Sequence, residues 1–413
     1  MKQILLPLLW VMITIAGAQD YPVQLRLLQP IGVGARAYGL SNNHVALSSG
    51  ISDLYWNPAA LSFSVTREFQ ASLYAIQTNS SSLFFKTETK AFLPRFNMSN
   101  AGFSIALPTT RGGLSFAFSY TNPLIFDDIS DFAGAYQLLN STTIVSVDQN
   151  TRRSQGGLNY WTAGFGLQVA PNIGVGLATS LVTGKEKTKD QFYETATYDT
   201  IQVITEVDDI IVGRYIGYDI RAGIRYKTDV IGAGMRIIAP QIMRLKEEFN
   251  SDPIDDVYTM YSSWEGAVGI SATLPFITIS TELRGVLPYG FLFPEEDIPE
   301  SSQAGHTKVG GGVGIEVPLL IVPLIFRTGY SLDELDLHKY MYLFENDREF
   351  NWSDGGVTVD RNRHQVSAGL GYTTASMSFD LAYGFSTWGI ISNTYLHETF
   401  FVHRVLASFA IRF

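Results

Sequence analysis

The sequence predicts an all-β protein, a transmembrane outer-membrane β-barrel of about 14 antiparallel strands with an N-terminal plug inside its lumen. Three observations support this fold. From about residue 67, apolar side chains alternate with small, polar or charged ones. The connections between the alternating segments are short and long in turn. The last alternating segment ends in an aromatic residue at the C-terminus, Phe413.

Residues 1–18 have the pattern of a secretory signal peptide. A lysine follows the first methionine, an apolar run comes next, and Ala16-Gly17-Ala18 supplies a small-residue cleavage site. The apolar run is shorter than the roughly 20 residues that a membrane-spanning helix needs. We therefore expect cleavage after Ala18 and export of the mature chain; a retained membrane anchor is the alternative.

The composition excludes several classes of protein. Hydrophobic residues make up 46% of the 413 residues and charged residues only 16%, which is a low charge content for a soluble secreted protein. The chain has no cysteine, so it has no disulfide scaffold and no thiolate metal site. The net charge of −10 argues against a nucleic-acid partner. The balance favours a β-barrel that presents alternate apolar side chains to lipid.

Residues 19–66 precede the alternating segments and are predicted to form the plug. This part is rich in small residues, which permit close backbone packing, and its apolar residues Leu54 and Trp56 argue against a disordered linker. Gly32, Gly34 and Ala37 fit a dinucleotide-binding fingerprint. That motif needs a strand before it and a helix after it, whereas here further glycines interrupt the segment that would have to be the helix.

The plug also carries Gly34-Ala35-Arg36-Ala37, then Gly39, and later Tyr55-Trp56-Asn57-Pro58-Ala59-Ala60. These motifs resemble the N-terminal hatch of the outer-membrane long-chain fatty-acid transporter (FadL/OMPP1/TodX) superfamily. The Trp before Asn57 resembles its PorV-type branch in particular. The resemblance implies a hatch turn at Asn57, Pro58 and Ala59, with Gly34 and Gly39 in close contact with other backbone. Ser41–His44 depart from the small residues usual there.

Residues 67–413 are predicted to form the barrel. We place strands at 67–78, 99–107, 112–121, 158–170, 173–185, 213–227, 229–243, 262–274, 276–285, 306–317, 322–333, 362–373, 376–388 and 399–413. Residues 79–98 are either an extra strand or part of a long first loop. The short links are expected on the periplasmic side and the long segments, such as 186–212 and 334–361, outside the cell. A C-terminal Phe on the last strand resembles the signal for outer-membrane barrel assembly.

No arrangement of residues in the sequence suggests catalysis, and we expect no enzyme, no metal site and no cofactor. The six histidines lack metalloprotease spacing, and no nucleophile elbow is present. Charged residues on the lumen face are expected to pair with one another and hold the plug. Alternatively, Arg221, Arg225 and Arg327 are candidates for binding the head group of a ligand.

Two functions fit these features. The first is passive uptake of small hydrophobic compounds such as long-chain fatty acids across the bacterial outer membrane, as the resemblance implies. The second is a PorV-type role as an attachment or secretion partner for other proteins. Apolar clusters at Leu124–Phe126, Pro288–Pro294 and Lys339–Phe344 suit an entry groove, a docking patch for a protein partner, or packing of loop against loop.

Overall fold

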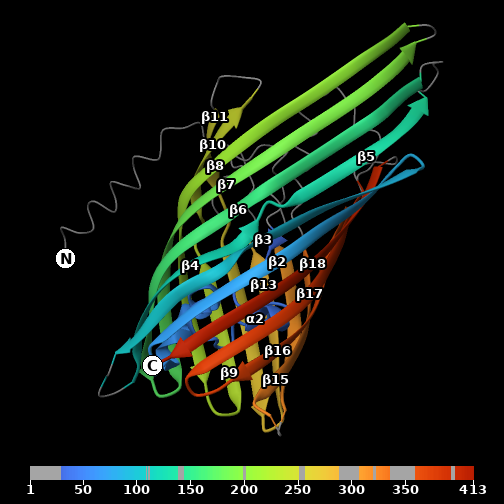
Figure 1. The fold of residues 1–413 in the computed structure, drawn as a ribbon. Helices are drawn as coiled ribbons and strands as arrows, with labels where there is room; N and C mark the ends of the chain where they lie inside the picture. Colours follow the sequence, from blue (N-terminus) through green and yellow to red (C-terminus); the bar gives the residue numbers. More distant parts are fainter. Residues whose placement is uncertain are drawn as a thin grey trace.

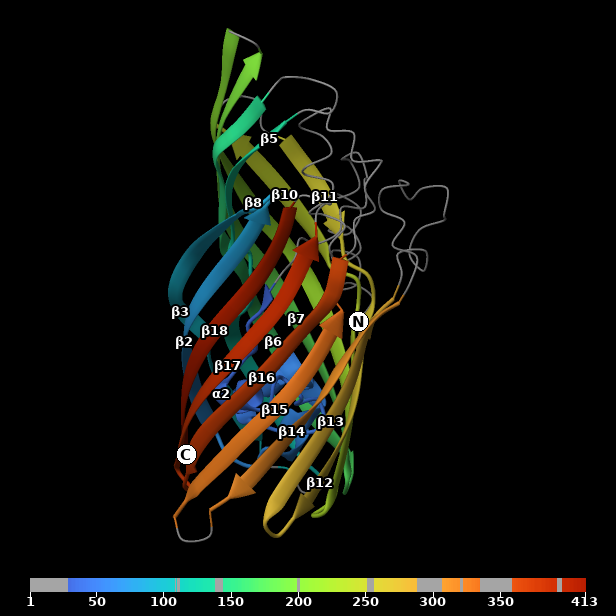
Figure 2. The same ribbon diagram turned by 90° about the vertical axis from the view of Figure 1, so that its right-hand side faces the viewer.

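The computed structural model describes residues 29–107, 109, 112–137, 144–198, 201–250, 256–287, 307–319, 322–334, 359–391 and 396–413. The expected signal peptide and the clusters Pro288–Pro294 and Lys339–Phe344 lie outside these residues. In the described part, antiparallel strands wind into one closed barrel around a set of short helices (Figures 1 and 2).

Fourteen strand positions close the barrel in the described residues. They are β2 (Glu68–Phe84), β3 (Thr87–Leu107), β4 (Leu114–Ile125), β6 (Ile144–Ala170), β7 (Ile173–Tyr198), β8 (Ile201–Lys227), β9 (Ile231–Ile238), β12 (Glu265–Leu274), β13 (Ile277–Val286), β14 (Lys308–Pro318), β15 (Leu324–Glu334), β16 (Val359–Thr373), β17 (Met377–Ile391) and β18 (Leu396–Arg412). The last strand pairs with the first, from Arg412↔Glu68 to Leu396↔Phe84. Each of the 14 predicted segments coincides with one of these strands, so the predicted fold is confirmed.

Four further short strands extend or accompany the barrel strands. β5 (Asp128–Gln137) continues β4 along β6, and β10 (Ile242–Phe249) continues β9 along β8. β11 (Asp256–Tyr261) pairs with β10 and leads into β12. The two-residue β1 (Gln29–Pro30) pairs with β4.

The period of two along each strand separates two environments. On β17, Phe379, Leu381 and Tyr383 point outward and are 48%, 44% and 48% exposed, whereas Ala382 between them is 2% exposed. Equivalent outward rows of Leu, Ile, Val and Phe circle the barrel, which forms an apolar belt of the kind that faces lipid. Among the described residues, no helix is both long enough and apolar enough to cross a membrane.

The two ends of the barrel differ. Short turns, such as Pro171-Asn172 and Pro275-Phe276, join strands at the end where the C-terminus lies (Figure 1). At the other end β6, β7 and β8 rise well above the remaining strands as a projecting sheet (Figures 1 and 2). Short turns are typical of the periplasmic side, which puts the projecting sheet outside the cell.

Two expectations about the outer end need correction. Residues 79–98 are neither an extra strand nor a long loop, because β2 and β3 continue to a tight turn at Phe85, whose φ is 54°. Residues 186–212 are expected as a long loop, but most of them extend β7 and β8, which pair from Ile173↔Tyr226 up to Tyr198↔Ile201. Hydrogen bonding to neighbouring strands stabilises polar segments that show no apolar periodicity.

Candidate functional site

The hatch, residues 31–64, fills the lumen of the barrel near its periplasmic end (Figures 1 and 2). It contains α2 (Ala35–Gly39), η1 (Gly50–Ser52), α3 (Asp53–Trp56) and η2 (Pro58–Phe63), joined by turns. Small residues such as Ala35, Ala37, Ala59 and Ala60 are almost fully buried. A segment with so few large side chains can bring its backbone against the wall on all sides.

The Asn57-Pro58-Ala59 turn joins the hatch to the wall. Asn57 is extended, and its side-chain oxygen accepts a hydrogen bond from the Ala59 amide at 3.1 Å, which caps η2. Its side-chain amide donates to the carbonyl oxygens of Val45 at 2.9 Å and Ile224 on β8 at 3.2 Å. Pro58 occupies the first position of η2, where no amide donor is needed.

The wall behind the hatch is lined by glycines, which we call the glycine seat. A methyl group on Gly176 would overlap the Ala59 amide, and one on Gly223 would overlap the Asn57 side chain. Gly234 is as close to the Val45 carbonyl, and Gly329 to the backbone of Leu40. The seat spans consecutive strands and comprises Gly166, Gly174, Gly176, Gly223, Gly234, Gly269, Gly312, Gly314, Gly329 and Gly384. Hatch backbone therefore packs directly on wall backbone at Gly166, Gly176, Gly234 and Gly329, and hatch side chains occupy the space at the other glycines.

The two glycines singled out in the sequence have looser surroundings, and the atoms nearest to them belong to side chains. Gly34 has a φ of 84°, and a Cβ atom there would lie 3.3 Å from Ser52 Oγ. Gly39 faces β15 and β16, with a Cβ atom 3.5 Å from the Cβ of Arg327 and 3.6 Å from the Cα of Gly369. Ser41–His44 is the segment where the sequence departs from the motif of the resembling family. There Ser41 adopts a positive φ of 52°, a conformation that glycine usually occupies.

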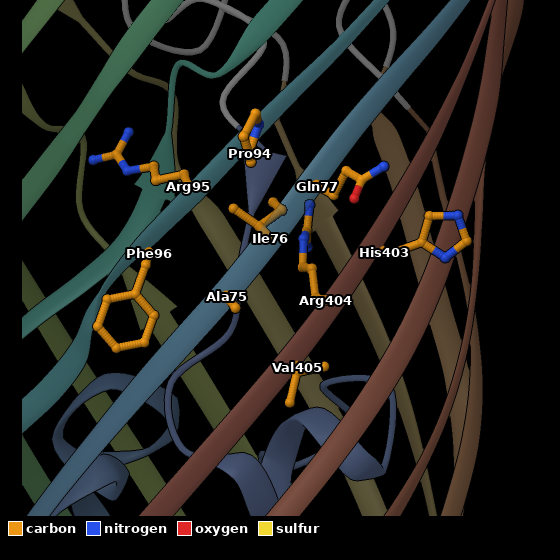
Figure 3. Close-up of a pocket in the computed structure, with 9 residues that line it drawn as sticks. All are labelled: Ala75, Ile76, Gln77, Pro94, Arg95, Phe96, His403, Arg404 and Val405. Carbon is orange, nitrogen blue, oxygen red and sulfur yellow. The ribbon is translucent and has the colours of Figure 1, made fainter.

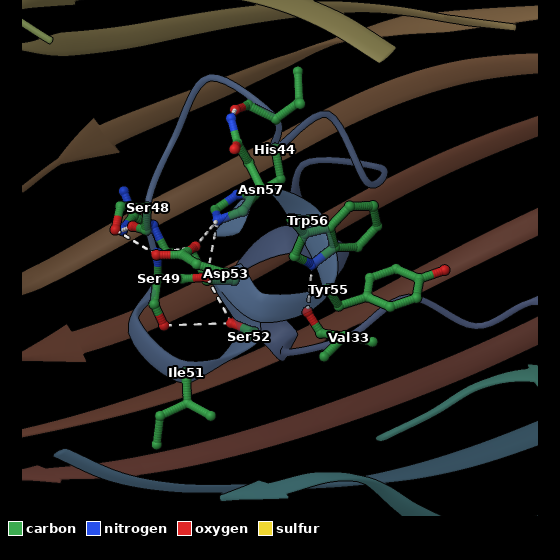
Figure 4. A network of polar contacts seen from close by, with 12 residues as sticks. Val33, His44, Ser48, Ser49, Ile51, Ser52, Asp53, Tyr55, Trp56 and Asn57 are labelled. Carbon is green, nitrogen blue, oxygen red and sulfur yellow. Dashed lines mark hydrogen bonds and ion pairs between the residues drawn. The ribbon is translucent and has the colours of Figure 1, made fainter. Parts of the chain in front are cut away.

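Inside the hatch, His44 and Asp53 organise a polar network (Figure 4). Asp53 accepts hydrogen bonds from the Ser48 hydroxyl at 2.6 Å and the Ser49 amide at 2.9 Å. His44 Nε2 lies 2.8 Å from Ser49 Oγ and 3.7 Å from Asp53 Oδ1. Trp56 donates its indole N–H to the Val33 carbonyl at 2.8 Å, which ties α3 to the start of the hatch.

Buried charges on the wall hold the hatch from outside. The carboxylate of Glu282 accepts the backbone amides of His44 and Val45, at 2.8 and 2.9 Å. Glu316 forms a two-pronged pair with Arg36 of the hatch, with both N···O distances 2.8 Å. A carboxylate held this way is fixed in position and direction. The sequence places Glu282 and Glu316 among the lumen-face charges expected to hold the plug, with Glu282 opposite Lys308. Nothing local marks His44, Val45 and Arg36, some 240–280 residues earlier, as their partners.

Two of the three candidate arginines are already paired. Arg327 donates to Glu316 and Asp380, each at 2.6 Å, and is 2% exposed. Arg221 donates to Asp219 at 2.7 Å and to the Tyr55 carbonyl at 3.1 Å, and its guanidinium lies 4.5 Å from the Tyr55 ring. Both side chains therefore secure the hatch and its wall.

Arg225 differs from the other two. It is 5% exposed, and its Nε and Nη1 groups have no hydrogen-bond partner in the described structure. Its guanidinium lies 5.7 Å from the Phe63 ring at the end of η2. Arg225 lies on β8 two residues after Gly223, the glycine that contacts the Asn57 side chain, and is closer to the periplasmic turn. A buried cation with spare donors is a site that an anion would satisfy.

Among the described residues, two of the buried apolar clusters contain stacked aromatic pairs. One brings Tyr74, Ile76, Trp388, Phe400 and Val402 together with Tyr38 of the hatch, and the rings of Trp388 and Phe400 stack 5.5 Å apart.

The second cluster lies on β6, β7, β8 and β10. It contains Phe126 stacked on Tyr215 at 4.9 Å, with Leu158, Val182 and Leu245 around them. Leu124 packs against this cluster, and Ile125 belongs to the first one. Leu124–Phe126 are therefore not the loop cluster expected from the sequence, because Leu124 and Ile125 belong to β4 and all three residues pack inside the barrel.

The wall is irregular between β3 and β4. These strands pair only from Asn100↔Thr121 to Leu107↔Leu114. Beyond that point β1 takes the place of β3, with Gln29↔Ile125 and Pro30↔Leu124. Arg95 of β3 reaches across to Asp127 with an N···O distance of 2.5 Å. The segment just before the hatch, β1, thus pairs with the barrel wall where β3 and β4 no longer pair with each other.

A groove of about 510 Å³ lies nearby on β2, β3 and β18 (Figure 3). Six of its nine lining residues have exposed side chains: Ala75, Gln77, Pro94, Phe96, His403 and Val405. Because these residues belong to the outward rows of their strands, the groove opens on the outside of the barrel.

Comparison with known proteins identifies the fold. No protein-family model and no curated protein matches the sequence. Among solved structures, a FadL homologue of Pseudomonas aeruginosa superposes with a TM-score of 0.61 at 10% identity, covering 93% of this chain and 99% of that chain. The toluene transporter TodX of P. putida gives 0.60 at 12% identity, covering 93% and 99%. The toluene transporter TbuX of Ralstonia pickettii gives 0.55 at 14% identity, covering 92% and 98%.

The resemblance expected from the hatch motifs is therefore confirmed at the level of the fold. The chain has the fold of the FadL homologue and of TodX. Its apolar belt is the kind of outer surface that a membrane-spanning barrel presents to lipid.

Proposed function

We propose that the protein is an outer-membrane channel for passive movement of small hydrophobic compounds, closed at rest by its hatch. The observation that carries this proposal is the combination of apolar lumen clusters with a hatch seated on glycine. Stacked aromatic pairs such as Trp388–Phe400 and Phe126–Tyr215 offer a surface for an apolar ligand. Solved structures with this fold include transporters of toluene.

The hatch gives the channel its gate. Its contacts with the wall are close packing against glycines, hydrogen bonds and the Arg36–Glu316 ion pair. None of them is a strand pairing of the barrel, so they can separate without dismantling it. Ligand in the apolar clusters would compete with Tyr38, which packs there from α2. A ligand that binds the open arrangement better than the closed one shifts the hatch toward opening.

We further propose that the transported class includes long-chain fatty acids. Arg225 supports this choice, because it alone among the three candidate arginines lacks a carboxylate partner in the described residues. Arg225 lies beside η2, so a fatty acid that passes the hatch would present its carboxylate to the unpaired Nε and Nη1 groups of this side chain. A neutral hydrocarbon gains nothing from such a contact.

The test compares palmitate with hexadecanol, which has the same chain length but no charge. Native mass spectrometry of the purified protein should show both ligands bound, with palmitate retained more strongly. Arg225→Gln should remove most of the preference for palmitate, by about tenfold, since a charge-assisted hydrogen bond contributes about 1.5–3 kcal/mol. Arg67→Gln, at an exposed position just before β2, is the matched control and should behave as the wild type.

The outcomes separate the two levels of the proposal. Equal binding of palmitate and hexadecanol by the wild type would contradict the role of Arg225 but leave a hydrophobic channel. Binding of neither ligand, together with a stoichiometric protein partner that co-purifies with the barrel, would contradict the channel and favour a protein-attachment role of the PorV type.

A further inference from the structure

The outer surface of the barrel has one strongly basic area. It lies on β6, β7, β8 and β10, and we call it the basic face. Its members are Arg153, Lys185, Lys187, Lys189, Arg214, Arg244 and Lys246. The net charge of the whole chain is −10, so this concentration of cations is not a reflection of overall composition.

Strand register shows that these side chains share one side of the sheet. Lys185 pairs with Arg214 across β7 and β8, and Arg214 pairs with Lys246 across β8 and β10. One step further out, Lys189 pairs with Arg153 on β6. Directly paired residues in a sheet point to the same side, so the cations form one continuous surface.

This side of the sheet is the one that faces lipid lower down. On β7 the row that ends in the lysines begins with Leu177 and Leu181, which are 44% and 51% exposed. On β8 the residue two positions from Arg214 in the same row is Ile216, which is 54% exposed. Two residues along a strand cover about 7 Å. The basic face therefore starts immediately beyond the apolar belt, on the extracellular side.

Most of the positive charge on this face is not neutralised by the protein. Glu248 lies 3.2 Å from Arg214 and 3.5 Å from Lys246, and Asp208 lies 3.5 Å from Lys189. Among the described residues, Lys185 and Lys187 have no ion-pair partner.

The wall made by β16, β18 and β2 is different. Its outward rows toward the extracellular end carry His364, His403, Gln77 and Asn79 in place of lysine and arginine. In the described residues, these three strands thus lack the row of cations found beside the projecting sheet.

We propose that the basic face binds the phosphate groups of an outer-leaflet glycolipid whose acyl chains lie along the apolar belt below. Lysine and arginine side chains at the height of lipid head groups attract phosphate, and each contributes separately. An apolar surface continuous with the cations fits one molecule that has both a phosphorylated head and several acyl chains. This lipid would hold the wall beneath the projecting sheet, whatever ligand passes through the lumen.

The experiment uses the full-length protein in detergent with three lipids: bis-phosphorylated lipid A, the same lipid with both phosphates removed, and phosphatidylglycerol. Native mass spectrometry counts the retained lipid. Wild-type protein should retain phosphorylated lipid A in preference to the other two. The preference should fall as ionic strength rises from about 0.1 M to about 0.5 M, because salt screens exposed charges.

The double variant Lys185→Gln/Lys187→Gln should weaken retention of phosphorylated lipid A by roughly thirtyfold, from two basic residues at the head-group level. The matched control Lys86→Gln/Lys90→Gln removes the same charge near the tip of the β2–β3 hairpin and should leave retention unchanged. Equal retention by wild type and the Lys185/Lys187 variant would overturn the proposal. Equal retention of lipid A with and without phosphates would do so as well. Tighter retention of phosphatidylglycerol than of lipid A would overturn the assignment to the outer leaflet.

Discussion

The side-chain amide nitrogen of Asn57 lies 3.2 Å from the carbonyl oxygen of Ile224, a residue of β8 that is 167 positions away in the sequence. The same nitrogen lies 2.9 Å from the carbonyl oxygen of Val45 on the far side of the hatch. One amide group thus joins two parts of the hatch to the barrel wall. Because Asn57 is fully buried, water does not compete for these bonds.

Replacing Asn57 by alanine should loosen the hatch without unfolding the barrel. The change leaves two carbonyl groups and the Ala59 amide without their partner, which we expect to cost about 3 kcal/mol. Hydrogen exchange of hatch amides should then be roughly a hundredfold faster, while that of barrel amides stays unchanged. Asn79→Ala, which removes an exposed side chain bonded to Phe401, is the control. Unchanged hydrogen exchange of the hatch amides in Asn57→Ala would argue against this role of Asn57 in holding the hatch.

The glycine seat predicts that one methyl group is enough to lift the hatch. In Gly223→Ala the new methyl would overlap the Asn57 side chain, so the hatch must shift at a cost of about 1–3 kcal/mol. Liposomes containing the variant should swell faster in a small sugar than those with wild-type protein. Gly266→Ala has its nearest neighbour at 3.9 Å and should swell at the wild-type rate. Equal swelling rates for Gly223→Ala and Gly266→Ala would contradict the proposal that the glycine seat holds the hatch closed.

The hatch should also respond to pH through His44. Burial is the largest influence on this imidazole and lowers its pKa, while Asp53 and Glu316 act to raise it and Arg36 acts to lower it further. A histidine whose pKa is lowered in the closed hatch binds its proton more easily when the hatch is open. Closure is therefore favoured above the ordinary pKa of about 6.5 and is weakened as pH falls below it.

Hydrogen exchange of the hatch measures this response. After correction for intrinsic rates, wild-type hatch amides should be less protected at about pH 5.5 than at about pH 7.5. His44→Gln keeps a neutral polar group and should show equal protection at both values. A wild-type hatch whose protection does not change with pH would contradict the assignment of a neutral, buried His44.

Much of the barrel could be predicted from the sequence because one physical rule, alternate exposure to lipid and lumen, is written along each strand. Rows such as Phe379, Leu381 and Tyr383 reveal a strand wherever lipid is present. In the part of the barrel above the membrane, no lipid is present and the side chains no longer alternate between apolar and polar. The outer half of β7, from Lys185 to Tyr198, is mostly polar in both rows, and only its pairing with β6 and β8 shows that it is a strand. The turn at Phe85 lacks the glycine, proline or asparagine that usually mark a turn.

Only part of the candidate site could be predicted from the sequence. Asn57-Pro58-Ala59 stands out because a turn and a cap are local properties, and the structure places this turn against β8. The roles of the arginines depend on partners that are distant in the sequence. Arg327 is paired by Asp380, 53 positions later, whereas Arg225 has no such partner in the described residues. Only the folded barrel distinguishes a structural arginine from one with free donors.

The central claim, that the hatch must move for a ligand to pass, can be tested with a disulfide. The hydroxyl oxygens of Ser41 in the hatch and Ser367 on β16 lie 2.8 Å apart. Cysteines at these positions are close enough to bridge. The chain has no cysteine of its own, so Ser41→Cys/Ser367→Cys would form a single lock. Ser154→Cys/Thr188→Cys, with its oxygens 2.8 Å apart, is the control that joins the two wall strands β6 and β7.

The measurement is uptake of radiolabelled palmitate by Gram-negative cells that lack their own fatty-acid channel and produce each variant. Oxidised Ser41→Cys/Ser367→Cys should block uptake, and a reductant should restore it. Ser154→Cys/Thr188→Cys should take up palmitate in both the oxidised and the reduced state. Uptake at the wild-type rate through the oxidised hatch lock would show that ligand passes without hatch movement and would contradict the account.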